Sequence, residues 1–94
     1  MNEPDFFVAI SARIVTDKEL TMNAKGVAIG LYDLANFYAS NGHEGTPITV
    51  EMIQKSFGGT KLEITSGIEE LSKAGCIVLD SEKNVIELFT RRTK

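Results

Sequence analysis

The stretch from Thr49 to Leu79 constrains the fold of this chain more than any other part of it. It reads TVEMIQKSFGG, TKLEITSGIEELSKAG and CIVL, which predicts a helix, a break at two glycines, a second helix, a glycine stop and a strand. Thr60 can cap the second helix with its hydroxyl while Glu63 reaches back to the cap amide, the reciprocal pairing of a capping box. Gly75 can then adopt the left-handed conformation that ends a helix.

Two short helices joined by about three residues and followed directly by a strand are typical of a helix-turn-helix that leads into a wing. The residues after Gly75 agree with this, because CIVLD, SEKN and VIELF predict a strand, a turn and a strand. Lys83 and Asn84 then lie near the tip of the hairpin.

Two further elements are expected before this segment. Residues 6–11 are rich in β-branched and aromatic types, which favours a strand. Thr21 is a suitable N-cap for a helix from Met22 to about Ser40. We therefore expect an α+β fold over residues 1–94, one single domain with a strand, three helices and a C-terminal two-stranded wing.

The helix expected over residues 22–40 is apolar on more than one side, which is typical of a central helix or of one in a dimer contact. Gly26 and Gly30, one turn apart, would let another backbone approach closely. Two interpretations remain open for this helix: close packing inside the domain, and a homodimer contact.

Composition favours a soluble intracellular protein. The chain has 94 residues, of which 43% are hydrophobic and 24% charged, as in ordinary globular domains. No apolar run approaches the roughly 18 residues that span a bilayer, so no membrane partner is expected. The start, MNEPDFFVAI, is acidic where a signal peptide would be basic, and a single cysteine cannot form an internal disulfide. A cytoplasmic location is the simplest expectation.

The sequence holds little that resembles catalytic or metal-binding machinery. His43 is the only histidine, and a zinc site needs about four clustered ligands. Cys76 opens an apolar strand, which suits a structural thiol better than a reactive one. Gly58-Gly59 are not followed by the lysine of a phosphate-binding loop. We therefore expect no enzymatic activity, no bound metal and no cofactor.

One segment of the sequence resembles the corresponding segment of a known family. Residues 17–21, DKELT, followed by Asn23-Ala24-Lys25 and an apolar run to Leu34, resemble the opening of the replication-initiator domains of plasmids and of phage replisome organisers. Residues 70–77, ELSKAGCI, are similar to the "E-L-x-x-x-G-x-I" ending of many winged helices. The resemblance covers about residues 6–80. It implies a winged-helix, DNA-binding protein of phage or plasmid type that acts in DNA replication or transcription regulation.

Binding to double-stranded DNA has to rely on local rather than overall charge, because the net charge is −3. The expected outward positions of the recognition helix are Lys61, Glu63, Thr65, Ser66, Glu69 and Glu70, of which only the first is cationic. We expect the helix around residues 61–66 to enter the major groove, with phosphate contacts from the hairpin tip and the basic tail. The candidate DNA-binding residues are Lys55, Lys61, Thr65, Ser66, Lys83, Arg91 and Arg92.

The same residues are also compatible with a second function. Few cations and several acids lie on the recognition helix, so the domain could instead be a protein-interaction module, such as a phage-type inhibitor or adaptor. Its acidic face would then meet a basic protein partner. The residues of that face are Glu63, Glu69 and Glu70, with Asp80 and Glu82 nearby.

Overall fold

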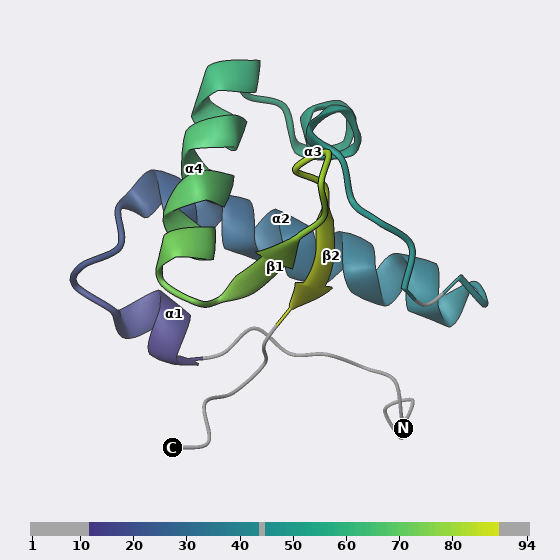
Figure 1. The fold of residues 1–94 in the computed structure, drawn as a ribbon, viewed down its shortest axis with the longest axis horizontal. Helices are drawn as coiled ribbons and strands as arrows, with labels where there is room; N and C mark the ends of the chain where they lie inside the picture. Colours follow the sequence, from purple (N-terminus) through teal and green to yellow (C-terminus); the bar gives the residue numbers. More distant parts are fainter. Residues whose placement is uncertain (1–11, 44, 89–94) are drawn as a thin grey trace.

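The computed structural model describes residues 12–43 and 45–88 (Figure 1). Over these residues four helices precede a C-terminal antiparallel hairpin, so the fold is α+β as expected. The elements are α1 (Ala12–Thr16), α2 (Met22–Ser40), α3 (Val50–Phe57), α4 (Lys61–Lys73), β1 (Ile77–Leu79) and β2 (Val85–Leu88).

The start of the chain differs from the expected order. The strand expected over residues 6–11 lies outside the described residues. A short helix that the sequence analysis did not predict, α1, comes before α2 and packs against it. Ile14 of α1 and Leu20 of the following turn are both buried in the core. Residues 12–43 and 45–88 therefore hold one helix more than the three that were expected.

Local capping sets the starts and ends of the longer helices. The hydroxyls of Thr21, Thr49 and Thr60 each accept a hydrogen bond from a backbone N–H in the first turn of the helix that follows, at 3.1 Å. The predicted capping box is present, because the Glu63 carboxylate accepts from the N–H of Thr60 at 2.9 Å. Gly75 has a φ of 79°, which confirms the predicted left-handed stop after α4.

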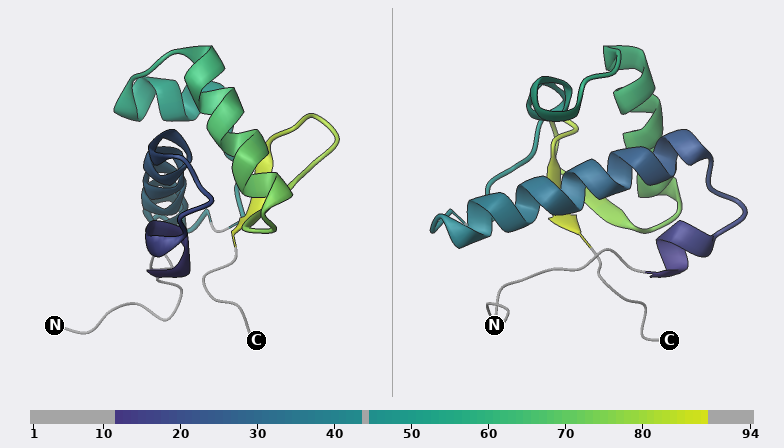
Figure 2. Two further views of the ribbon diagram at one scale, coloured as in Figure 1. Left: turned by 90° about the vertical axis from the view of Figure 1, so that its left-hand side faces the viewer. Right: turned by 180° about the vertical axis from the view of Figure 1, so that it is seen from behind.

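The core forms where α2 meets the other elements. Seen from the side, α2 is viewed end-on beside α4 and the hairpin, with α3 above it (Figure 2). Leu31 of α2 and Leu71 of α4 have no exposed surface. Gly67 allows α4 to approach α2 closely, because a Cβ at that position would lie 2.6 Å from the Cγ2 atom of Val27. Close packing within the domain thus involves a glycine of α4 that was not singled out for this role.

An isolated bridge to Ile48 extends the two-stranded sheet on the far edge of β2. β1 and β2 are antiparallel, with Ile77 opposite Leu88 and an irregularity between Val78 and Leu79. In addition, Ile48 and Val85 exchange two backbone hydrogen bonds, at 2.8 and 2.9 Å. Because Val85 uses both backbone groups in this bridge, Ile48 lies along the edge of β2 that faces away from β1. The hairpin is compatible with the expected wing, and it is anchored to the loop before α3.

Candidate nucleic-acid interface

The exposed side of α4 is the natural starting point for a nucleic-acid interface. Its buried side carries Ile64, Gly67, Ile68 and Leu71. The residues on the opposite side recur every three or four positions, as neighbours on a helix surface do. These are Leu62, Thr65, Ser66, Glu69 and Lys73, of which Thr65 is half-buried and the others are exposed.

The structure brings four of the predicted site residues together beside the hairpin tip. Lys61 and Thr65 of α4 and Lys83 of the turn before β2 line one groove between these elements. Ser66 and Lys83 line an adjoining groove, together with Glu69 and Lys73. Side chains from two separate elements therefore converge on one surface, which we call the α4–hairpin face.

The remaining predicted residues are not part of this face. Lys55 is exposed in the last turn of α3 and lines neither groove. Arg91 and Arg92 lie outside the described residues.

Cations and anions are mixed along the first groove. Lys61 and Lys83 are accompanied there by Glu51, Glu69 and Glu82. The Lys61 ammonium is 3.9 Å from a Glu51 carboxylate oxygen, and their side chains are 69% and 72% exposed. An ion pair this exposed contributes little to stability, so Lys61 can exchange this partner for another anion at small cost.

Three of the five residues of the proposed acidic face have partners within the fold. Glu63 closes the capping box of α4. Glu70 was expected to point outward, but it is half-buried and accepts hydrogen bonds from the N–H and the hydroxyl of Thr21, at 2.7 and 2.8 Å. One carboxylate oxygen of Asp80 accepts from two backbone N–H groups of the hairpin turn, both at 2.9 Å. Of the five residues of that face, only Glu69 and Glu82 accept no such bond from the described part of the chain.

The hairpin tip holds Lys83 in a conformation that few residues adopt. Its φ is 68°, and within the described part of the chain it is the only residue other than glycine with a positive φ. Its N–H donates to the carbonyl of Asp80 at 2.9 Å, which closes the turn. The Lys83 side chain is exposed. A glycine would fit this backbone with less strain, so the turn itself does not require a lysine.

Two exposed residues of α4 were missed by the sequence analysis. Leu62 is 75% exposed although it is a large apolar residue, and Lys73 adds a cation at the far end of the face. The signal was available in the helical spacing, since Leu62 lies two positions before the buried Ile64 and so on the opposite side of the helix.

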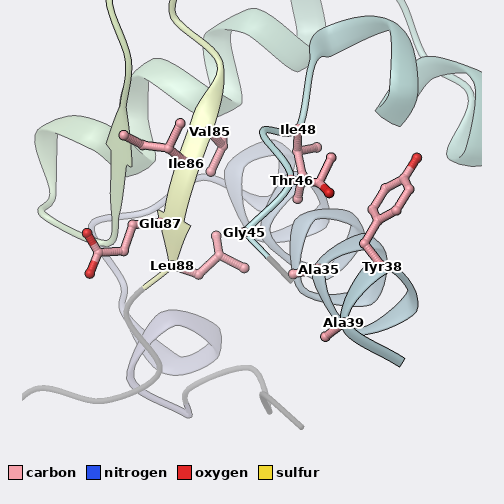
Figure 3. A pocket seen from close by; sticks show the side chains of 10 residues that line it. All are labelled: Ala35, Tyr38, Ala39, Gly45, Thr46, Ile48, Val85, Ile86, Glu87 and Leu88. Atoms are coloured by element: carbon pink, nitrogen blue, oxygen red, sulfur yellow. The ribbon is translucent and has the colours of Figure 1, made fainter. Parts of the chain in front are cut away.

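A separate pocket on the other side of β2 has a different character (Figure 3). It lies between α2, the loop before α3 and β2, and Glu87 is the only charged residue among those that line it. Its walls are mostly apolar, with Ala35, Ile48 and Leu88 among them. A pocket that lacks cations and contains a carboxylate does not suit a phosphate group.

Residues 12–43 and 45–88 contain no cluster of three or more histidine, cysteine or acidic side chains that could hold a metal ion. Over the same residues, no helix has the length and apolar character needed to cross a bilayer. The chain matches no protein-family model, no curated protein and no solved structure.

Proposed function

We propose that the chain is a winged-helix DNA-binding protein in which α4 is the recognition helix and the hairpin is the wing. The observation that carries this proposal is the convergence of Lys61 and Lys83, from two separate elements, on one groove beside the exposed side of α4. A transcription regulator or a replication initiator of phage or plasmid type fits the resemblance of residues 6–80 to initiator domains.

The exposed side chains of α4 offer groups for reading bases. The hydroxyls of Thr65 and Ser66 can donate to or accept from base edges in the major groove. Leu62, at the start of the helix, can contact the methyl group of thymine, which is a common apolar contact in DNA recognition. These three residues lie in the N-terminal half of α4, the part of a recognition helix that reaches the bases.

Phosphate contacts would come from the cations around that helix. Lys61 and Lys83 stand at either side of the first groove, and Lys73 lies along the second. Lys55 and the tail residues Arg91 and Arg92 are further phosphate ligands in this proposal. Each neutralised phosphate releases counterions, so a handful of such contacts gives measurable, strongly salt-dependent binding even for a chain with negative net charge.

Capture of a basic protein partner by the acidic face has less support. Glu63, Glu70 and Asp80 already accept hydrogen bonds from the protein's own backbone. These bonds supply a reason for three acidic residues that requires no ligand. The carboxylates that remain, Glu69 and Glu82, share the first groove with two lysines.

Fluorescence anisotropy of a labelled random-sequence duplex, titrated with the full chain at low and then at physiological salt, tests the proposal. We expect binding at low salt that falls steeply with added salt. Lys61→Glu and Lys83→Glu should each weaken it, whereas Lys18→Glu, a matched change at an exposed lysine in the turn before α2, should do so much less. A duplex that stays free at low salt and high protein concentration would rule the proposal out.

A further inference from the structure

One side of α2 is covered by no other described element. In the right-hand view of Figure 2, α2 is nearest the viewer, and α4 and the hairpin lie behind it. This side carries Met22, Ile29 and Phe37, which are 81%, 55% and 58% exposed. They are spaced by about two helical turns, so they form one stripe along the helix.

The glycines of α2 differ in what lies against them. At Gly30 a Cβ would be 3.1 Å from the ring of Phe57, so this position is already covered within the domain. At Gly26 a Cβ would have nothing within 4 Å, and Gly26 lines a groove with Met22 and Phe57. Of the two glycines predicted to allow close approach, only Gly26 leaves space for another molecule.

The charges on this side of α2 are arranged symmetrically. Lys25 lies one turn before Ile29 and Asp33 one turn after it, so the three residues follow one row along the helix surface. Neither charged side chain makes an ion pair with another residue of the described chain. A row with a cation, an apolar centre and an anion is complementary to a copy of itself that runs in the opposite direction.

We propose that this face binds a second copy of the chain. In the commonest class of helix packing, rows of residues four apart lie side by side and the helices cross at about 50°. With the two rows antiparallel, a two-fold axis passes at Ile29, and Lys25 lies opposite Asp33 of the partner subunit. Ile29 of each copy then enters the space beside Gly26 of the other.

Charge complementarity and symmetry are what favour a second copy over a different partner. An isologous contact requires that one surface be complementary to itself, and this row satisfies that condition with equal and opposite charges around an apolar centre. The groove beside Gly26 is also lined by Glu63 and Ile64 of α4, but neither of these residues lines the grooves of the α4–hairpin face. The contact therefore does not depend on DNA binding and leaves the α4–hairpin face open in both subunits.

Sedimentation velocity of the full chain, over loading concentrations from micromolar to near-millimolar, tests the proposal. The wild type should show a concentration-dependent dimer. Ile29→Glu should raise the dimer dissociation constant at least about tenfold, because it places two carboxylates together at the two-fold axis. Leu62→Glu is the matched control, since Leu62 is even more exposed but lies on α4. Thermal melts by circular dichroism establish that both variants are folded.

Charge exchange tests the antiparallel arrangement. Lys25→Asp and Asp33→Lys should each weaken the dimer, because each sets like charges opposite one another across the interface. The double variant carrying both changes should recover most of the wild-type association. A wild type that is monomeric at every concentration would overturn the proposal, as would a dimer that Ile29→Glu leaves intact. Failure of the double variant to recover association would overturn the antiparallel pairing.

Discussion

The carboxylate of Glu70 is bound to both polar groups of Thr21, although 49 positions separate the two residues. One oxygen accepts from the Thr21 N–H at 2.7 Å and the other from its hydroxyl at 2.8 Å. The same hydroxyl accepts from the N–H of Ala24 in the first turn of α2. Glu70 therefore joins α4 to the N-cap of α2, and its negative charge lies at the positive end of that helix.

We expect Glu70→Ala to lower the free energy of unfolding by about 1–3 kcal/mol, because it removes two hydrogen bonds to a charged acceptor. Urea denaturation followed by circular dichroism measures the change. The neighbouring Glu69→Ala is the matched control and should change stability by less than about 0.5 kcal/mol, since Glu69 is exposed. Equal effects of the two substitutions would contradict the role assigned to Glu70.

Two glycine-to-alanine substitutions should have opposite effects on stability. Gly67→Ala places a methyl group 2.6 Å from the Cγ2 atom of Val27, so we expect a loss of about 1–3 kcal/mol as α4 is forced away from α2. Gly26→Ala meets nothing within 4 Å and should gain about 0.5–1 kcal/mol from better helix propensity. Thermal unfolding of both variants and the wild type measures these changes. A low protein concentration keeps self-association from contributing to them. If Gly67→Ala instead raises stability, α2 and α4 are not tightly packed at this position.

Lys83→Gly should separate stability from DNA binding. Glycine adopts the positive φ of this position without strain, so we expect stability to be unchanged or to rise by up to about 1 kcal/mol. The same change removes a cation from the α4–hairpin face and should weaken duplex binding and reduce its salt dependence. Anisotropy titrations and urea denaturation of one protein preparation give both quantities. If the affinity for the duplex is unchanged, Lys83 does not contact DNA.

Glu69→Lys should strengthen duplex binding. Glu69 lines both grooves of the α4–hairpin face, where a carboxylate repels phosphates. Replacing it with a cation should raise affinity by about tenfold at low salt and make the salt dependence steeper. Glu19→Lys, an equal change of charge at an exposed site in the turn before α2, controls for net charge alone. Equal gains from both variants would mean that only total charge matters.

The features that the sequence predicted are those set by short-range interactions. The capping box of Thr60 and Glu63, the stop at Gly75 and the hairpin around Lys83 each depend on residues a few positions apart. The features that it did not predict depend on tertiary contacts. Glu70 looked like a solvated residue because its partner comes from the other end of the domain. The short helix α1, whose Ile14 is buried, packs against α2 and so also depends on the tertiary fold.

The same distinction applies to the candidate site. Lys61, Thr65 and Ser66 could be grouped from helical spacing alone, but their position beside Lys83 depends on how the hairpin packs against α4. The place of Leu62 was predictable from the helical period and was nevertheless missed.

The bridge between Ile48 and Val85 has a consequence for how the domain opens. Its two backbone hydrogen bonds close a ring of chain that contains α3, α4 and β1. The hairpin therefore cannot swing away from α3 and α4 without breaking the bridge at the buried Val85, which is 1% exposed. Helices and hairpin should then lose their structure in one cooperative step, and the amide hydrogens of both bridge residues should exchange with solvent only through that global event.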